Sequence, residues 1–118
     1  MNNSLEPVYD QFYQHILAKS PALDPDLAIR IMQIQRSLKK ISPSRSKPHV
    51  NLYVKYRDGV KLDQKVEEYR DKYPIQSSVS RWQDGVILSG LMSIDNVQTI
   101  ASDSDIVDIK GQANARHN

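Results

Sequence analysis

The sequence predicts an α+β fold, in which a helical hairpin precedes an antiparallel sheet with two crossover helices. Three observations lead to this prediction. Before residue 42, apolar residues recur every three to four positions, which is the period of an amphipathic helix. After residue 48, several short segments alternate apolar and polar residues, as half-buried strands do. Residues 42–48 are rich in proline and serine, a composition typical of a linker between the two parts.

Residues 1–41 predict the hairpin of two helices. Val8, Phe12 and Ile16 lie at helical spacing, and Ser20-Pro21 ends that helix because the residue before a proline avoids helical geometry. Asp24 is a suitable cap for the second helix. Five apolar residues then follow at steps of four and three, forming a heptad seam: Leu27, Ile31, Ile34, Leu38 and Ile41. We expect this seam to pack on its own domain or on a second copy of the chain.

Residues 49–110 predict the element order β-α-β-β-α-β. The expected strands are residues 50–56, 75–82, 86–92 and 106–109, and the expected helices are residues 62–73 and 94–101. Asp84-Gly85 predicts a tight hairpin turn between the second and third strands. This order is typical of a ferredoxin-like domain, a four-stranded antiparallel sheet with both helices on one face. Residues 111–118 are expected to form a polar tail.

Composition excludes several kinds of site. The 118 residues include no cysteine, which rules out disulfides, thiolate zinc sites and a cysteine nucleophile. His15, His49 and His117 lack metal-ligand spacing, and no phosphate-binding loop or nucleophile elbow is present. We therefore expect no catalytic residue, no cofactor and no metal. Without a long apolar run or a secretory signal pattern, we expect a cytoplasmic protein that has no contact with a membrane.

Four segments carry a resemblance to a known family. Residues 50–60 (VNLYVKYRDGV) look like the opening strand and turn of subtilisin-type propeptides, and residues 85–92 (GVILSGLM) resemble their central strand. Residues 94–101 and 105–109 are similar to the short helix and the last strand of that domain. Residues 49–118 thus resemble subtilisin propeptides and the stand-alone inhibitors of subtilisin-like serine proteases that share their fold.

The resemblance implies that this protein binds and inhibits a protease. In that family the open face of the sheet lies on the enzyme, and the tail after the last strand enters the active-site cleft. The tail residues that would do so here are Ala113, Asn114, Ala115, Arg116, His117 and Asn118. The sheet-face residues that would contact the enzyme are Tyr53, Lys55, Trp82, Ile87 and Leu91, within a mixed surface that also includes Asn51, Ser78, Ser80 and Ser89.

Two alternatives remain open. Eight basic residues and no acid lie between Asp26 and Asp58, although the whole chain has a net charge of only +2. Lys39, Lys40, Arg45 and Lys47 in this segment suit a nucleic-acid-associated regulator that uses residues 30–57. A self-associating scaffold would instead use the 27–41 seam and the sheet face. The position of the two N-terminal helices discriminates, because helices lying over the open face would block its use in binding.

Overall fold

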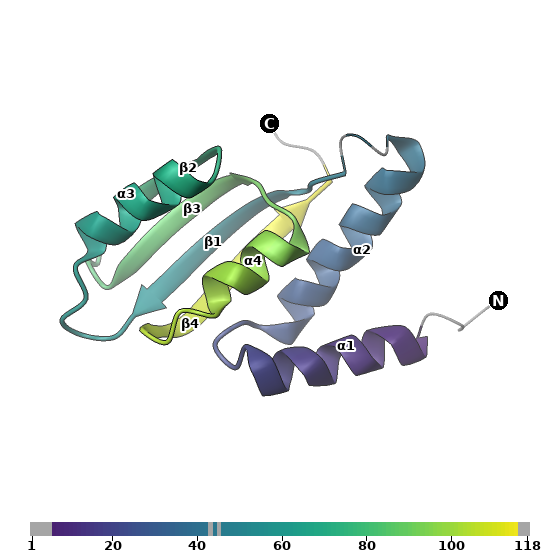
Figure 1. Cartoon of the computed structure of the whole chain (residues 1–118), viewed down its shortest axis with the longest axis horizontal. Coiled ribbons are helices and arrows are strands. Elements are labelled where there is room, and N and C mark those ends of the chain that lie inside the picture. Colours follow the sequence, from purple (N-terminus) through teal and green to yellow (C-terminus); the bar gives the residue numbers. More distant parts are fainter. Residues whose placement is uncertain (1–5, 43, 45, 116–118) are drawn as a thin grey trace.

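The computed structural model describes residues 6–42, 44 and 46–115, and it confirms the α+β prediction. Within these residues, four helices and a four-stranded antiparallel sheet form the fold (Figure 1). The elements follow in the order α1 (Glu6–Lys19), α2 (Pro25–Ile41), β1 (His49–Tyr56), α3 (Leu62–Lys72), β2 (Ile75–Val79), β3 (Gly85–Leu91), α4 (Ile94–Ala101) and β4 (Ile106–Asn114).

The sheet has the strand order β2-β3-β1-β4, with every neighbouring pair antiparallel. Side chains of successive residues point to opposite faces of a strand, so β1 divides cleanly. Val50, Leu52 and Val54 are fully or almost fully buried. Asn51 and Tyr53, between them, are only partly buried. One face of the sheet is therefore the core face, and the other carries the polar half of the strand pattern.

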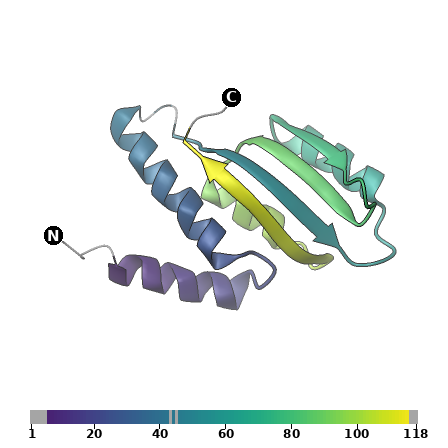
Figure 2. The ribbon, with the colours of Figure 1, turned by 180° about the vertical axis from the view of Figure 1, so that it is seen from behind.

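Helices α3 and α4 cover the core face. Figure 1 shows both helices in front of the sheet, and Figure 2, from behind, shows the sheet in front of them. Val66 of α3 and Val97 of α4 are buried in the same core as the inward residues of β1. Ser93 begins α4 with a capping box, in which its hydroxyl accepts from the Asn96 amide at 3.1 Å and its own amide donates to the Asn96 side chain at 3.0 Å.

The helical hairpin lies beside β4 and leaves the second face of the sheet open. The Ile109 amide donates to the Ala22 carbonyl at 2.8 Å, and Leu23 forms a parallel bridge with Ile109. Helix α2 contacts β4 and α4, and the Ile94 amide donates to Gln35 Oε1 at 2.9 Å. Figure 2 shows the hairpin at the β4 edge, with the sheet unobstructed from this side. The position of the two N-terminal helices, beside the sheet and not over its second face, therefore favours an accessible sheet face.

The heptad seam packs within the chain. Leu27, Ile31 and Ile34 are buried, Leu38 is partly buried against the core, and only Ile41 is exposed, at 82%. The elements that contact α2, and against which the seam packs, are β4, α4 and α1. The seam is thus occupied by its own domain, and a second copy of the chain would find only Ile41 there.

Two expected boundaries are wrong. Strand β2 ends at Val79 and not at Trp82, because the chain turns through residues 80–84, where the Gln83 amide donates to the Ser80 carbonyl at 2.9 Å. Gln83 has a positive φ of 56°, so the connection is a longer loop than the expected Asp84-Gly85 turn. Strand β4 continues to Asn114, and residues 111–114 belong to the sheet rather than to a tail.

Candidate functional site

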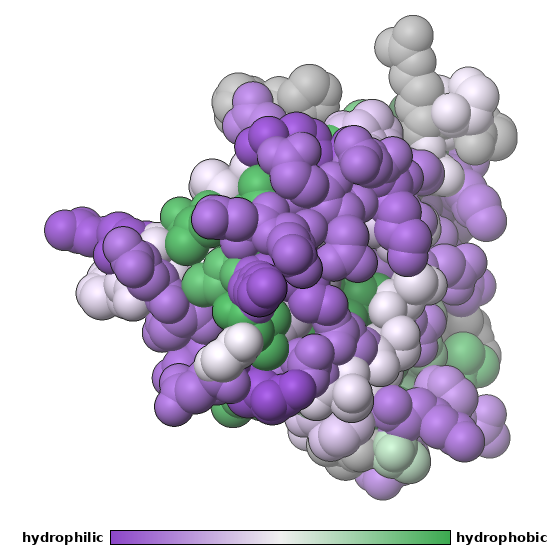
Figure 3. Space-filling model, turned by 60° about the vertical axis from the view of Figure 1, so that its left-hand side comes forward, coloured by the Kyte–Doolittle hydropathy of each residue, from purple (hydrophilic) through white to green (hydrophobic). Residues whose placement is uncertain are grey.

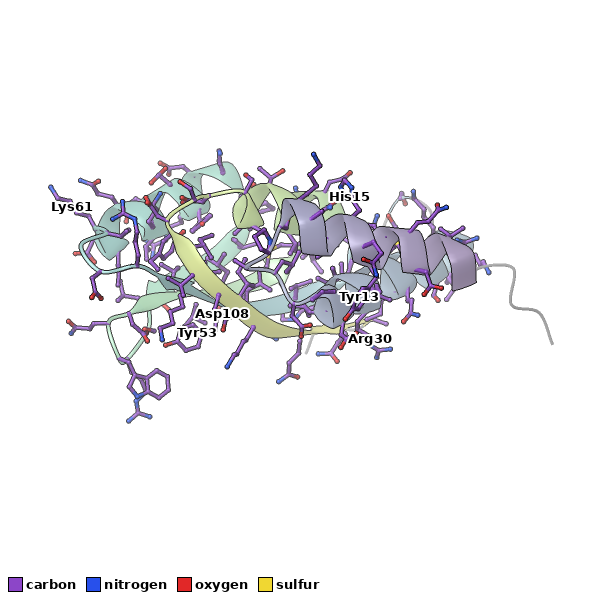
Figure 4. All side chains as sticks on the ribbon, turned by 90° about the horizontal axis from the view of Figure 1, so that it is seen from below. Tyr13, His15, Arg30, Tyr53, Lys61 and Asp108 are labelled. Atoms are coloured by element: carbon purple, nitrogen blue, oxygen red, sulfur yellow. The ribbon has the colours of Figure 1, made fainter. Side chains whose placement is uncertain are left out.

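The open face of the sheet is the candidate site. We use this name for the outward residues of the four strands, together with Trp82 from the loop between β2 and β3. The strand residues are His49, Asn51, Tyr53, Lys55, Gln76, Ser78, Ile87, Ser89, Leu91, Asp108, Lys110, Gln112 and Asn114. Register brings them together from distant parts of the chain, since Tyr53 lies opposite both Ile87 and Lys110. Figure 4 shows Tyr53 and Asp108 on the same side of the sheet.

A stack of aromatic rings lies at one end of the open face. The rings of Tyr53 and Trp82 are almost parallel, at 9°, with their centroids 6.0 Å apart. The Arg81 guanidinium lies 5.5 Å from the Trp82 ring, within cation–π range. Trp82 remains 65% exposed despite these contacts. Figure 3, which brings the left-hand side of the molecule forward, shows a surface that is mostly hydrophilic, with a few hydrophobic patches.

Hydrogen bonds hold the stack in place. The Tyr53 hydroxyl donates to the Asp84 carboxylate, and the Ser80 hydroxyl donates to the same Asp84 Oδ1 at 2.9 Å. These bonds favour the ionised acid and lower the pKa of Asp84, and the bond from Tyr53 has a larger effect than the bond from Ser80. The bond to the carboxylate in turn raises the pKa of Tyr53. The phenol is therefore a fixed, neutral support on which the indole lies.

The rest of the open face mixes apolar and polar side chains. Ile87 is partly exposed beside Tyr53, and Leu91 is exposed at the far end of β3. The Ser89 hydroxyl donates to Asn51 Oδ1 at 2.6 Å, which satisfies two polar groups within the face. Aromatic and aliphatic groups surrounded by polar ones are typical of protein-binding surfaces.

The structure brings together the sheet-face residues expected from the sequence, with one correction. Tyr53, Lys55, Ile87 and Leu91 all belong to the open face. Ser80, expected on this surface, is only 3% exposed, because it lies in the loop and bonds to Asp84. Lys110 and Gln112 were missed because β4 was expected to end at residue 109, and Asp108, inside the expected strand, was not assigned to the sheet face. The alternation of Asp108, Lys110 and Gln112 was the available signal.

The first two residues of the expected protease-binding tail are part of the sheet. Ala113 pairs with Val50 and is 5% exposed, and Asn114 pairs with His49. The assignment of Ala113 to an active-site cleft is therefore wrong, because its side chain lies in the core. Ala115 is exposed beyond the strand. The other predicted tail residues, Arg116, His117 and Asn118, lie outside the described residues.

The basic segment divides into parts with different surroundings. Lys39 and Lys40 are exposed in the last turn of α2, and Lys47 is exposed in the connection to β1. Lys55 lies instead on the open face. Arg57 is held by Asp105, with Nε 2.6 Å from Oδ1. Arg45 lies outside the described residues.

A second polar cluster lies between α3 and the loop that follows α4. The hydroxyls of Tyr56 and Tyr69 bond to each other, and Lys65 Nζ lies 2.8 Å from Asp103 Oδ2. Burial, followed by the hydrogen bond, raises the pKa of Tyr56 far above its ordinary range, and burial raises that of Tyr69. Burial opposes ionisation of Asp103, but the bonds from Lys65 and the Asp105 amide outweigh it and lower its pKa. This cluster joins α3 to residues 103–105.

A metal site and a membrane-spanning helix have little support in the described part of the chain. No three histidine or acidic side chains there are grouped as metal ligands would be. In the same residues, no helix has the length and apolar character needed to cross a membrane. Comparisons with protein-family models, with curated proteins and with solved structures find no match.

Proposed function

We propose that this chain is a non-enzymatic protein-binding module that binds its partner through the open face. The observation that carries the proposal is an accessible sheet face with an exposed Tyr53–Trp82 stack. An antiparallel sheet packs one face on its core and can leave the other to solvent, where polar residues normally dominate. Here Trp82, Ile87 and Leu91 lie on the accessible side. Trp, Tyr and Arg are also the residues most enriched at the energetic centres of interfaces.

The same proposal assigns the domain to the ferredoxin-like arrangement. Its support is the order β-α-β-β-α-β together with β1 and β3 as the two central strands. Both crossover helices, α3 and α4, contribute to one core under one face. The consequence for function is that the central strands present their outward residues where a partner can reach them.

The partner class that we propose is a subtilisin-like serine protease. Support comes from the resemblance of residues 49–118 to subtilisin propeptides, in which the open face lies against the enzyme. The part of the tail that could reach a cleft begins at Ala115, beyond the end of β4. Lys110, opposite Tyr53, and Ala115 are five residues apart, or about 17 Å along an extended chain. A protease that contacts both the stack and the tail would therefore cover most of the length of the sheet.

The size of the open face sets a further requirement. With strands of about eight residues spaced about 4.8 Å apart, four strands cover roughly 500 Å². A stable interface buries about 800 Å² on each partner. The loop at residues 80–84 and the residues after Asn114 would enlarge this footprint. We therefore expect both ends of the sheet, and not the strands alone, to contribute to binding.

The experiment is a titration of the protein into a subtilisin-type protease, followed by inhibition and by calorimetry. Trp82→Ala and Ile87→Lys should each weaken binding about 30-fold or more, the loss expected for an energetic hot spot of an interface. Ile41→Lys is the matched control, because Ile41 is an exposed isoleucine on α2, away from the open face. Deletion of residues 115–118 should remove inhibition and leave β4 complete.

Three results would contradict the proposal. If the wild-type protein binds no subtilisin-type protease at micromolar concentrations, the partner class is wrong. Equal losses for Ile87→Lys and Ile41→Lys would exclude the open face as the binding surface. Inhibition that survives the deletion would exclude the substrate-like role of the tail, even if the face binds.

A further inference from the structure

The outer side of α2 is a strip of cations that the open face does not include. The inner side of this helix is apolar and buried on the rest of the domain, through Leu27, Ile31 and Ile34. The exposed side chains of α2 before Ile41 are all polar or charged: Asp26, Arg30, Gln33, Arg36, Ser37, Lys39 and Lys40. We call Arg36, Lys39, Lys40 and the following Lys47 the basic strip. Figure 4 shows Arg30 of the same helix and Tyr53 in opposite halves of the molecule.

The basic strip lacks compensating carboxylates. No acid occurs between Asp26 and Asp58 in the sequence. The ion pairs found among the described residues involve Arg57, Lys65, Arg70 and Lys110, and none of them involves the strip. Asp95 follows the α4 amide that bonds to Gln35, yet it forms no ion pair with α2 in this part of the chain. The charges of the strip are therefore available to an anion in solution.

The placement of these cations has a cost within the helix. Arg36 precedes Lys39 and Lys40 by three and four residues, the spacings at which side chains are neighbours on a helix. Like charges at these spacings destabilise a helix by about 0.2–0.5 kcal/mol for each pair. Their position in the last turns offsets this cost, because cations there interact favourably with the helix dipole. The dipole accounts for cations near the end of α2, but it does not require three of them within five residues.

The composition of the strip favours phosphate over a protein surface as its partner. Lysine is depleted at the centres of protein interfaces, where aromatic residues are enriched. The strip contains three lysines, and no apolar residue lies among the exposed side chains of α2 before Ile41. Arg36 and Lys40 are one turn apart, about 6 Å along the axis. A nucleic-acid duplex offers one negative charge for about every 1.7 Å of its axis, so a row of cations at this spacing always finds phosphates within reach.

We propose that the basic strip binds the phosphodiester backbone of nucleic acid, without reading its sequence. The contact is made by Arg36, Lys39, Lys40 and Lys47 as point charges on phosphates. Binding by four cations predicts that the logarithm of the association constant falls with the logarithm of the salt concentration with a slope of about −3.6 for duplex DNA. Between 50 and 200 mM salt this slope corresponds to a loss of about 150-fold. The surface is separate from the open face, so protein binding and nucleic-acid binding are independent properties.

The test is fluorescence anisotropy of the full chain with two labelled probes, a 20-base-pair DNA duplex and a single strand of twenty thymidines, across a salt series. Lys39→Gln/Lys40→Gln removes two phosphate contacts and should weaken duplex binding about 60-fold at 0.1 M salt, with the slope falling to about −1.8. The matched control is Lys61→Gln/Lys72→Gln, which removes two exposed lysines from the region of α3. The control should bind as the wild type does. Circular dichroism melting of both variants verifies that the fold is intact.

The outcomes separate the proposal from its alternatives. Binding that is lost in the α2 variant and kept in the control supports the strip, and the stronger of the two probes identifies the form of nucleic acid. No binding of either probe at 50 mM salt would overturn the proposal. Equal losses in the two variants would mean that overall charge, and not the strip, attracts the probe. Poly-glutamate that binds as tightly as the DNA would assign the strip to an acidic protein instead.

Discussion

The buried pair of tyrosine hydroxyls offers a sharp test of the packing between β1 and α3. Tyr56 ends β1 and is 4% exposed, whereas Tyr69 lies on α3 and is 7% exposed. Their hydroxyls bond to each other. Replacing one of them, in Tyr56→Phe or Tyr69→Phe, removes a bond with a net contribution of about 1 kcal/mol and leaves the other hydroxyl without a partner, a penalty of about 1–3 kcal/mol. Each single variant should therefore lose about 2 kcal/mol of unfolding free energy.

The double variant should be more stable than either single one. With both hydroxyls gone, no buried polar group lacks a partner, and the loss should be below about 1 kcal/mol. The double-mutant cycle of unfolding free energies then gives a coupling of about 3 kcal/mol between the two positions. Urea unfolding followed by circular dichroism is the suitable assay, because Trp82 is too exposed to report folding well. Tyr73→Phe, at a partly exposed position on the same side of the domain, is the control and should change stability by less than about 0.5 kcal/mol.

Alkaline pH provides a second readout of the same pair. Both pKa values are raised by burial above the ordinary value of 10.0. A raised pKa in the folded state means that the contribution to stability is complete below pH 10 and is lost as the pH rises further, because the unfolded chain ionises first. The double variant should lack this alkaline loss. Single variants with wild-type stability, or a double variant whose loss equals the sum of the two, would show that water reaches the hydroxyls and would refute the reasoning.

Three further predictions concern the sheet, the loop and the hairpin. A Cβ at Gly90 would lie 2.7 Å from Ile75 Cγ2. Gly90→Ala should therefore lower the unfolding free energy by about 1–3 kcal/mol in urea unfolding. An unchanged midpoint would show that β2 can move away. The lowered pKa of Asp84 contributes stability above pH 4 that is lost as the pH falls through the lowered value. Asp84→Asn should therefore be less stable than wild type at pH 6, and a stability gap that does not narrow as the pH falls below 4 would contradict this. Ile31→Ala in the fully buried seam should cost about 2–5 kcal/mol, and a loss below 1 kcal/mol would mean that the hairpin is not part of the core.

The sequence predicted the element types and their order because the relevant signals are local. Alternation in residues 50–56 and helical spacing in residues 62–73 come from the burial of one face of each element. The end of β4 had a weaker signal of this kind, since polar residues still alternate at Asp108, Lys110 and Gln112 but Gly111 to Asn114 contain a single apolar residue. These residues pair with β1 because β1 is long enough to offer partners as far as His49. That pairing depends on the partner strand and cannot be seen in the sequence of β4 alone.

The candidate site was predictable in its members but not in its geometry. Tyr53, Ile87 and Leu91 follow from the strand period, as residues between buried ones. The stack of Trp82 on Tyr53 does not, because it depends on the backbone of the loop at residues 80–84 and on Asp84. The spacing of apolar residues also could not predict where the helical hairpin packs. The heptad seam predicts that one side of α2 is buried, but not which element buries it. The hydrogen bond from the Ile109 amide to the Ala22 carbonyl is one of the contacts that place the hairpin beside β4.

The most direct test of the protein-binding surface is a map of the amides that respond to an inactivated subtilisin-type protease. The protein, labelled with ¹⁵N, would be titrated with the enzyme while its amide spectrum is recorded. Shifts and line broadening should concentrate on the open face, at Asn51, Tyr53 and Ile87, and at Trp82 and its indole N–H. The amides of α3 should change little, because that helix lies under the opposite face of the sheet. Shifts confined to the helices, or no shifts at all, would contradict the assignment of the open face as the surface that binds this partner.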